Sequence, residues 1–483
     1  MLQPYRIIDK HFVAEDGSEH LLRIGVIGFV PPQIMLWDKS NLDGRVQCDG
    51  IVESAKRYLP ELRGNCDAVV ALCHSGISAA PARGRDENAS LHLAEIGGFD
   101  AIMAGHWHRV FPGPDYSGVR GVDLDRGTIA GVPTVMPGFW GSHLGVIDLV
   151  FAKDGDKWSI VNSTTEAKPI YRREKGAVVS LADADKNVID AIANDHAATV
   201  EWVGRPVGHF DRRIHSYFVW CGFDPASAIV NAAQIAYVKP LLAGTPHQGL
   251  PILSAAAPFK AGYTPDAYID IPAGQIALRD LADLYIYPNT VAAVRVTGAT
   301  IREWLEHASR IFNRIDTSRN ATQELIDRRV PSYNFDSIAG LSYSLDLSQP
   351  ARTNFEGKIV APDVHRVVDL RYLGEPLDLS REFVVVTNNY RADGGGSFPG
   401  LDGSNTIVRA PDTNLDAIIK FVSGGSNSMP SPHSPWTFAP LGHAVSVQFD
   451  SSPIGRECLP DVPSLRDAGN GNAGFSRYQF NLS

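Results

Sequence analysis

The chain has 483 residues, with 44 Lys and Arg against 54 Asp and Glu, so its formal net charge is −10 at pH 7. A hydrophobic fraction of 44% and a charged fraction of 20% are typical of a folded globular protein and exclude an intrinsically disordered chain. The acidic balance, without a long Lys/Arg run, speaks against binding to a nucleic acid polymer. No apolar stretch is long enough to span a membrane, so no membrane contact is expected.

Five cysteines occur in the chain, at positions 48, 66, 73, 221 and 458. Their odd number and the lack of CxxC spacing predict buried or incidental thiols, not a disulfide framework or a zinc knuckle. Residues 1–5 show neither the charged region nor the apolar region of a secretory signal, so no export leader is expected in the chain as printed.

Residues 1–180 are predicted to form a layered α/β domain. Apolar, β-branched runs indicate buried strands, and apolar positions spaced three or four apart indicate helices. Strands that alternate with helices in this way are typical of α/β folds. The predicted strands are 22–30, 67–73, 100–104, 132–136 and 144–151, and the predicted helices are 48–63 and 91–96.

The rest of the chain is predicted to hold a linking helix and a second α/β domain. The linker, 181–207, contains a helix expected at 182–203. The second domain, 208–455, is followed by a tail, 456–483, whose Gly/Asn/Asp-rich part at 461–473 is expected to be loose. Within the second domain, helices are predicted at 226–237 and 301–309, and strands near 285–287, 292–296, 341–347 and 383–387.

Three histidines directly follow predicted strands: His74 after one, and His106 and His108 after the next. Ligands of α/β sheets bind beyond the carboxyl ends of the strands, and neutral imidazoles suit zinc, manganese or iron. Gly76 and Gly105 beside them would let the backbone approach an ion. An extended backbone would point the rings of His106 and His108 in the same direction. The pattern favours a metal site, and the alternative is that each is a hydrogen-bonded structural histidine.

The three histidines do not complete a two-metal site, because such a site also needs a bridging carboxylate and other oxygen ligands. Asp9 and His11 have a D-x-H spelling, but their short alternating stretch is expected to be a solvent-facing edge strand or turn. Gly64-Asn65-Cys66 resembles a G-N-H element without its histidine. The sequence therefore predicts an incomplete metal site.

Long runs of the chain carry a family resemblance, and such runs are more specific than short motifs. They are 24–38, 69–77, 100–112 and 131–149 in the first half, and 253–262, 270–274, 283–290, 331–336 and 383–399 in the second. In these runs the chain resembles the bacterial 2′,3′-cyclic-nucleotide 2′-phosphodiesterase/3′-nucleotidases of the 5′-nucleotidase family. The resemblance implies a partial metallophosphoesterase-type domain, a connecting helix and a 5′-nucleotidase C-terminal-type nucleotide-binding domain.

The resemblance also implies roles for the histidines. The family holds two divalent metal ions, for which Zn, Mn or Co are candidates. His74 and His106 match the ligands of one ion, and His108 matches a ligand of the other. The family's D-x-H, G-D and G-N-H elements, the last with its catalytic histidine, would precede residue 1. We therefore expect a catalytic histidine to be missing from this chain and its hydrolytic activity to be impaired.

Two tyrosines match the aromatic pair that sandwiches the nucleobase in the resembled family: Tyr287 and Tyr390. Flat rings on both faces of a base bury apolar area and accept different bases. Asn389 is a candidate contact to the base, and Gly394 and Gly395 would allow close approach of the backbone to a sugar or phosphate. The residues alone leave open that both tyrosines belong to the core or to an unrelated surface.

The predicted function is hydrolysis of nucleotide phosphoesters at a two-metal centre. The rival prediction is a catalytically inactive protein that binds nucleosides or nucleotides, and a sugar-binding module is a third possibility. The expected partners are small nucleotides or nucleosides, with no nucleic acid polymer and no membrane, and a monomer is favoured. The resembled family implies a periplasmic location.

Overall fold

The computed structural model describes residues 3–155, 157–174, 177–425 and 429–482 of the chain. It divides into two compact units, Met1–Ile189 (unit 1) and Asp190–Ser483 (unit 2), and the boundary falls inside α5 (Lys186–Val203). Both units combine β-sheets with helices, so the predicted α/β class is confirmed. The finer division into four segments stays a prediction.

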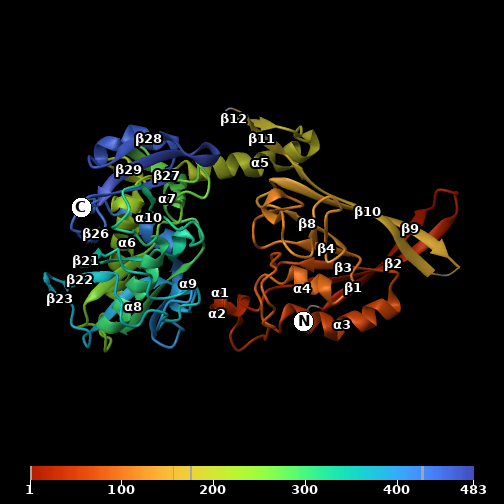
Figure 1. Cartoon of the computed structure of the whole chain (residues 1–483), viewed down its shortest axis with the longest axis horizontal. Coiled ribbons are helices and arrows are strands. Elements are labelled where there is room, and N and C mark those ends of the chain that lie inside the picture. The colour runs from red at the N-terminus through yellow and green to blue at the C-terminus, as the bar shows by residue number, and fades with distance from the viewer. Residues whose placement is uncertain (1–2, 156, 175–176, 426–428, 483) are drawn as a thin grey trace. The chain divides into compact units, whose positions relative to one another are not determined.

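The central feature of unit 1 is an eight-stranded sheet in the order β1-β2-β3-β4-β8-β7-β6, with β5 paired to β8 (Figure 1). β2, β3, β4 and β8 run parallel, so their carboxyl ends meet at one edge, where α/β sheets bind ligands. The strands are β1 (Tyr5–Val13), β2 (Glu19–Phe29), β3 (Ala68–Cys73), β4 (Ala101–Ala104), β5 (Val110–Phe111), β6 (Val122–Asp123), β7 (Thr128–Ile129) and β8 (Val132–Pro137).

Strand β1 is the edge of this sheet and pairs antiparallel with β2. Asp9 and His11 on it are exposed to solvent. The prediction of a solvent-facing edge strand is therefore confirmed, and the D-x-H spelling lies away from the carboxyl ends of the parallel strands.

Helix α3 (Ile51–Asn65) packs on β2 and β3 through a stripe of buried residues spaced four, four and three apart. It shares its core with α4 (Ser90–Glu95), so the helices predicted at 48–63 and 91–96 are present. The residues of the α3 stripe are Ile51, Ala55, Leu59 and Leu62. The remaining elements of unit 1 are α1 (Ile34–Trp37), α2 (Lys39–Leu42), β9 (His143–Asp154), β10 (Lys157–Pro169), β11 (Tyr171–Glu174) and β12 (Ala177–Ser180).

Unit 2 is built on a five-stranded sheet in the order β20-β15-β24-β18-β25. Alternate residues of β18 and β24 are buried on opposite faces, so helices cover the sheet on both sides. The strands are β15 (Ile252–Ala256), β18 (Thr290–Thr297), β20 (Ser337–Ala339), β24 (Glu382–Asn388) and β25 (Thr406–Thr413), and the helices are α6 (Pro225–Leu241), α7 (Leu278–Leu284), α8 (Gly298–Ala308), α9 (Asn389–Ala392) and α10 (Asn414–Ser423).

Two four-stranded sheets and two short pairs complete unit 2: β19-β27-β29-β28, β23-β22-β21-β26, β13-β17 and β14-β16. Their strands are β13 (Pro206–Phe210), β14 (Ile214–His215), β16 (Asp270–Ile271), β17 (Gly274–Ala277), β19 (Gln323–Glu324), β21 (Leu341–Leu345), β22 (Val367–Tyr372), β23 (Glu375–Pro376), β26 (Trp436–Phe438), β27 (Val445–Ser451), β28 (Arg466–Asn470) and β29 (Ser476–Leu482).

The expectation of a loose tail is wrong. Within 461–473, residues Arg466–Asn470 form β28, which pairs with β29 at the edge of a sheet. Alternate residues of β29 are buried, so a strand pattern closes the chain. Residues 461–473 carry no strand signal in the sequence, because Gly, Asn and Asp are depleted in strands.

The strand predicted near 285–287 is also absent from the structure, since this segment is a loop after α7. The buried residues Leu278, Leu281 and Leu284 lie three apart and form a helical face instead. Asp280 accepts a hydrogen bond from the backbone N–H of Ala277 at 2.8 Å, which favours a helix start there.

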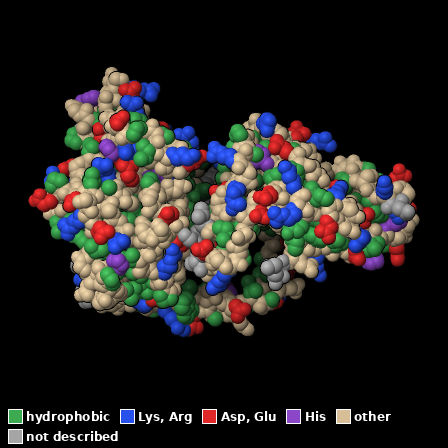
Figure 2. Space-filling view, turned by 90° about the horizontal axis from the view of Figure 1, so that it is seen from below, with side chains coloured by type: hydrophobic (Ala, Val, Ile, Leu, Met, Phe, Trp, Pro, Cys, Tyr) green, Lys and Arg blue, Asp and Glu red, His purple; other side chains and the backbone are tan. Residues whose placement is uncertain are grey.

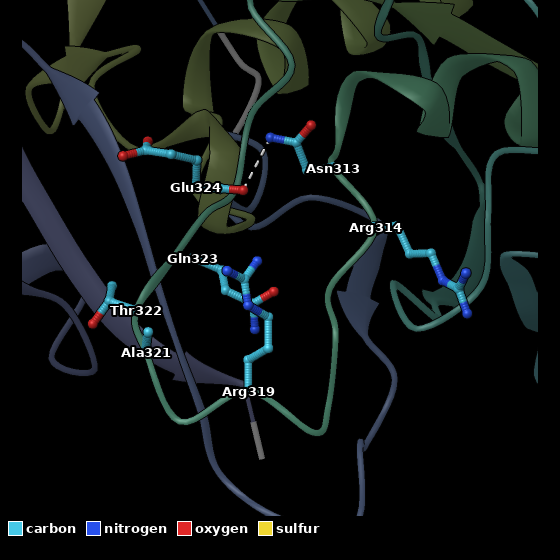
Figure 3. A pocket seen from close by; sticks show the side chains of 7 residues that line it. All are labelled: Asn313, Arg314, Arg319, Ala321, Thr322, Gln323 and Glu324. Atoms are coloured by element: carbon cyan, nitrogen blue, oxygen red, sulfur yellow. Dashed lines mark hydrogen bonds between the residues drawn. The ribbon is translucent and has the colours of Figure 1, made fainter.

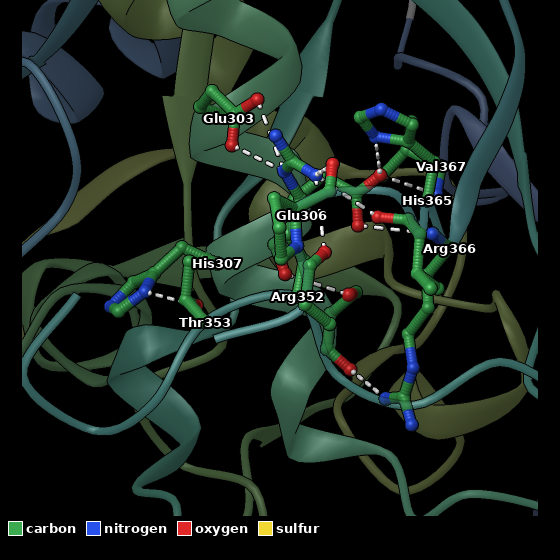
Figure 4. Close-up of polar contacts among 12 residues, drawn as sticks. Glu303, Glu306, His307, Arg352, Thr353, His365, Arg366 and Val367 are labelled. Carbon is green, nitrogen blue, oxygen red and sulfur yellow. Dashed lines mark hydrogen bonds and ion pairs between the residues drawn. The ribbon is translucent and has the colours of Figure 1, made fainter. Parts of the chain in front are cut away.

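A buried polar network surrounds α8 (Figure 4). The Glu306 carboxylate accepts hydrogen bonds from the backbone N–H groups of Arg366 at 3.0 Å and Val367 at 3.1 Å, and it lies 3.0 Å from Nδ1 of His365. These contacts satisfy a charge that would otherwise be costly to bury. They join α8 to β22.

The described helices include none that is both long and apolar enough to cross a bilayer. On the face that Figure 2 shows, acidic and basic side chains are interspersed, without a continuous basic area.

Candidate functional site

The three predicted histidines of unit 1 come together at the carboxyl ends of β3 and β4. The backbone N–H of His74 donates to the carbonyl oxygen of Phe29 at 3.0 Å, which places His74 beside the end of β2. The rings of His74 and His106 are 5.3 Å apart. Burial, and then the nearby His106, lower the pKa of both His74 and His108. Lowered pKa values favour neutral imidazoles, which is the form that binds metals.

The backbone of His106 and His108 is not extended, and this corrects the prediction that both rings point the same way. Both residues lie in the left-handed region, with φ of 69° and 55°. Their rings contact different partners: His106 stacks on Trp37 and His108 stacks on Phe139, each with ring centres 5.0 Å apart. Such backbone conformations cost about 1–3 kcal/mol for residues with a side chain and are concentrated at functional sites.

The ligand atoms of this edge are spread beyond one coordination sphere. Among the described residues of unit 1, no group of three His, Cys, Asp or Glu side chains has ligand atoms that all lie within 4.8 Å of one another. The donor set still fits a divalent metal in its chemistry, because neutral imidazoles are good ligands of ions such as zinc. The spread is compatible with the predicted sharing of the histidines between two ions.

Sequence reasoning missed Glu87, which lies at the same edge. Its Oε1 is 2.7 Å from Nε2 of His106. Ser75 holds the loop that carries it: the hydroxyl donates to the carbonyl oxygen of Glu87 at 2.6 Å and accepts from the N–H of Ala89 at 2.8 Å. Glu87 follows no strand, so its sequence signal was limited to an acidic pair, Asp86-Glu87, before a predicted helix.

The two glycines beside the histidines differ in what the structure requires of them. A Cβ at Gly76 would lie 2.3 Å from Asn88 Oδ1 and 2.9 Å from the Trp107 side chain, so only glycine fits there. A Cβ at Gly105 would meet Nδ1 of His74 at 3.6 Å, which is ordinary contact. Steric crowding therefore requires glycine at position 76 but not at position 105.

The tyrosines of unit 2 lie just beyond the ends of two neighbouring strands. Tyr287 precedes β18, and Tyr390 follows β24 in α9. Tyr287 is 39% exposed, which excludes a core position, and its ring packs edge-on against Phe259 with centres 5.3 Å apart. Burial, and then the nearby phenols of Tyr263 and Tyr390, raise the pKa of Tyr287. The structure thus brings Tyr287 and Tyr390 near one another, and Tyr263 is a neighbour that sequence reasoning missed.

Arg391 fixes the loop that carries Tyr390. Its buried guanidinium bonds the Asp336 carboxylate, with Nε at 2.7 Å and Nη2 at 3.1 Å, and also donates to the carbonyl oxygens of Tyr333 and Gly395. The backbone N–H of Gly395 donates to the carbonyl oxygen of Tyr390 at 2.8 Å. Sequence reasoning gave Arg391 no role, because its partner lies 55 residues away.

Two glycines and two asparagines shape the same loop. A Cβ at Gly395 would lie 2.4 Å from the Tyr390 ring, so glycine lets the ring lie against the backbone. Gly394 has a φ of 104°, a conformation that favours glycine. Asn388 caps α9, and Asn389 Oδ1 accepts from the N–H of Thr290 at 3.0 Å, which joins this loop to the one after Tyr287. Contacts of Asn389, Gly394 and Gly395 with a nucleotide stay predictions.

A polar hollow of about 330 Å³ lies elsewhere on unit 2 (Figure 3). None of the predicted site residues lines it, and one segment, 313–324, forms its wall. The amide nitrogen of Asn313 donates to the carbonyl oxygen of Glu324 at 3.0 Å and closes this segment on itself. The lining residues are Asn313, Arg314, Arg319, Ala321, Thr322, Gln323 and Glu324.

Comparisons with known proteins find a matching family model and similar chains. Residues 226–403 match the family model described as the 5′-nucleotidase C-terminal domain. The chain is 40% identical over 500 residues to a 2′,3′-cyclic-nucleotide 2′-phosphodiesterase/3′-nucleotidase of Salmonella typhimurium, covering 100% of this chain and 77% of that protein. It is 39% identical over 465 residues to the protein of the same description from Yersinia enterocolitica, covering 94% of this chain and 71% of that one.

Solved structures agree on the fold. A putative 5′-nucleotidase from Staphylococcus aureus, solved in complex with alpha-ketoglutarate, superposes with a TM-score of 0.64 at 18% identity. The match covers 89% of this chain and 74% of that one. At this level of identity the likeness establishes the fold alone, and it agrees with the α/β architecture of both units.

Proposed function

We propose, because the chain belongs to the family of 2′,3′-cyclic-nucleotide 2′-phosphodiesterase/3′-nucleotidases, that it acts on 3′-nucleotides and 2′,3′-cyclic nucleotides. Its relatives are named as hydrolases, and the family is one of metal-dependent phosphoesterases. The observation that carries the proposal is the meeting of His74, His106 and His108 at one edge of the unit 1 sheet.

Two divalent metal ions, Zn, Mn or Co, fit the histidine edge of unit 1. His74 and His106 would hold one ion, and His108 would contribute to the other. When bound, a pair of such ions supplies Lewis-acid stabilisation of a phosphoryl group and activates water. The chain's own contribution is to favour neutral imidazoles at His74 and His108 through burial, which lowers their pKa values, and to fix the His106 ring between Glu87 and Trp37.

The nucleobase would bind in unit 2 between Tyr287 and Tyr390. Both rings sit on loops that Asn389 joins, so the distance between them is set before a ligand arrives. Stacking accepts any base, because every base offers a flat apolar face. Gly394 and Gly395 keep the backbone free of side chains beside the Tyr390 ring, where a sugar would lie, and Asn389 would contact the base.

The hydrolytic activity of the 483-residue chain is expected to be low. Among the described residues of unit 1, the ligand atoms do not converge within 4.8 Å, so each ion would have few protein ligands. The same observation favours a second candidate function, in which the protein binds nucleosides or nucleotides without turning them over. The tyrosine loops support either function equally. We place the protein in the periplasm, as its family suggests, and favour a monomer.

Hydrolysis separates the two candidates. The purified chain should be mixed with excess Mn²⁺, Co²⁺ or Zn²⁺ and either 2′,3′-cyclic AMP or 3′-AMP, and phosphate release should be measured. Slow turnover that disappears in His106→Ala supports the hydrolase. Binding of adenosine without any turnover supports the second candidate. Turnover that survives His106→Ala would contradict the metal ligands assigned here.

Adenosine binding tests the tyrosine pair without any metal. Stacking is worth about 1–3 kcal/mol per aromatic residue, so Tyr390→Ala or Tyr287→Ala should weaken binding roughly 5- to 150-fold. Tyr171 of unit 1 is 38% exposed, almost as much as Tyr287, and Tyr171→Ala is the matched control. Calorimetry that gives equal adenosine affinities for Tyr390→Ala and the control would end the assignment.

A further inference from the structure

Unit 2 contains a group of potential metal ligands that the proposed phosphoesterase site does not use. It consists of His215 at the end of β14, with Cys458 and Asp461 in the 3-10 helix Pro453–Asp461. One ligand atom from each lies within 4.8 Å of the other two. Nε2 of His215 is 2.9 Å from an oxygen of Asp461. None of these residues belongs to the tyrosine loops or to unit 1.

The imidazole of His215 is fully buried and held in place by aromatic rings. It stacks between Tyr217 and Phe223, each with ring centres 5.1 Å from its own. Its other nitrogen, Nδ1, is buried and has no hydrogen-bond partner among the described residues. The ring is therefore preorganised, and its polar contacts are incomplete.

Burial also distinguishes the other two ligands. Cys458 is buried, whereas the Asp461 carboxylate is 44% exposed and leaves a path to solvent. A buried thiol with a buried imidazole and an accessible carboxylate offers sulfur, nitrogen and oxygen donors. This mixed set suits a borderline-soft divalent ion such as Zn²⁺ better than Mg²⁺ or Ca²⁺, which prefer oxygen ligands alone.

Charges around the group favour a cation. Arg213, next to β14, is a neighbouring positive group, and its guanidinium is paired with two carboxylates. Its Nε and Nη2 bond the Asp270 carboxylate at 2.6 and 2.7 Å, and its Nη1 bonds Glu457 at 3.1 Å. With Asp461 and a deprotonated Cys458 the surroundings are net negative, which attracts a divalent ion.

We propose that His215, Cys458 and Asp461 bind a zinc ion, with a fourth position open to water on the side of Asp461. The ion would join β14, near the start of unit 2, to a helix 246 residues later in the chain. A metal that closes so long a loop stabilises the folded state. The expected role is therefore to hold the C-terminal segment of unit 2 to the rest of the unit.

A catalytic Cys-His-Asp triad is the alternative use of the same residues. A catalytic thiol must be reached by its substrate, and its thiolate is the nucleophile. Cys458 is instead buried, with 4% of its surface exposed. A zinc ion would displace the thiol proton itself, as metals do when thiolates bind them. The geometry and the burial therefore favour the metal site.

Cobalt provides the direct test, because a Co²⁺–thiolate bond gives a charge-transfer absorption in the near ultraviolet that histidine and carboxylate ligands do not give. The chelator-treated chain should develop this absorption with one Co²⁺, and one equivalent of Zn²⁺ should remove it. Cys458→Ser should abolish it, while Cys221→Ser should leave it unchanged. Loss of His74 and His106 should have no effect, since those residues lie in unit 1. No absorption in the wild-type chain, or the same absorption in Cys458→Ser, would overturn the proposal.

Asp461→Asn guards against a variant that fails to fold. Asparagine at the half-exposed position 461 keeps an oxygen that can accept a hydrogen bond from Nε2 of His215, and it removes the negative charge. Co²⁺ should bind at least about tenfold more weakly to this variant, with the thiolate absorption retained at saturation. Zinc at 100 times its Kd should raise the Tm of the wild-type chain by roughly 5 °C more than that of Cys458→Ser, which keeps the histidine edge of unit 1. Unchanged Co²⁺ affinity in Asp461→Asn, or a Tm that zinc does not move, would each count against the site.

Discussion

The two units position their candidate residues in different ways. In unit 1, His74 and His106 follow parallel strands, so the sheet determines where their backbone lies, and Glu87 and Trp37 contact the His106 ring. In unit 2, Tyr287 and Tyr390 lie in loops that distant residues join and support. This difference teaches that a functional edge can be built by local strand geometry or by long-range polar contacts. Substitutions outside the site should therefore disturb the tyrosine loops more than the histidine edge.

The largest expected effect comes from Arg391→Ala. Asp336 is 4% exposed, and removing Arg391 would leave its buried carboxylate without a cationic partner, with the Trp304 indole N–H still donating at 2.7 Å. Loss of one partner of a buried ion pair costs about 3–5 kcal/mol. Stability of the variant should be measured by chemical denaturation, with adenosine binding measured on the fraction that remains folded. Arg329→Ala is the control, because Arg329 pairs with Asp327 at the surface and its loss should leave stability nearly unchanged. Equal stabilities of the two variants would show that Arg391 does not support the loop.

Acidic pH should lower the stability of unit 2 through His307, by less than Arg391→Ala does. Burial, and then the Arg310 guanidinium, lower the pKa of His307 from 6.5 to about 3. Between pH 6.5 and about pH 3, His307 is therefore protonated in the unfolded chain and neutral in the folded chain. Stability is full above about pH 6.5 and falls as the pH drops toward 3, with a loss of about 2 kcal/mol by pH 5.

His307 lies next to the glycine run of the Tyr390 loop, since Nε2 is 3.0 Å from the carbonyl oxygen of Gly396 (Figure 4 shows its contact with Thr353). Urea denaturation at pH 8 and pH 5 should show the loss in the wild-type chain and a smaller loss in His307→Gln. His209→Gln, at an exposed position, should behave as the wild type. The same pH dependence in all three proteins would exclude His307 as the acid-sensitive group.

The sequence predicted features that local patterns encode. Strands β3 and β4 and the histidines after them follow from apolar runs that end in His74 and in Gly105-His106, and the structure brings these histidines together. The metal role of these residues stays a prediction. The predicted common direction of the His106 and His108 rings was wrong, because their left-handed backbone depends on the surrounding fold and not on their spacing.

Features that depend on distant contacts were not accessible to the same reasoning. Arg391 meets Asp336 across 55 residues, and His215 meets Asp461 across 246. The segment 285–287 looked like a strand because it is aromatic and apolar, but α7 ends directly before it. β28 was missed because it is short, exposed and rich in Gly and Asn. In each case the deciding interaction lies outside the window that a local pattern describes.

The smallest expected effect is on the histidine edge, where Glu87→Gln should weaken metal binding by about tenfold. Carboxylates that contact a metal-binding histidine raise its basicity and orient its ring, and their loss typically costs 10–100-fold in affinity. Glutamine keeps a hydrogen-bonding oxygen near Nε2 of His106, so the lower end of that range is expected. Calorimetric titration with Mn²⁺ in a Cys458→Ser background, which removes the ligand group of unit 2, measures this edge alone. Glu95→Gln is the control, because Glu95 contacts His92 and Arg120 instead. If Mn²⁺ binds both variants equally well, Glu87 does not support the edge, and local strand geometry alone positions His106.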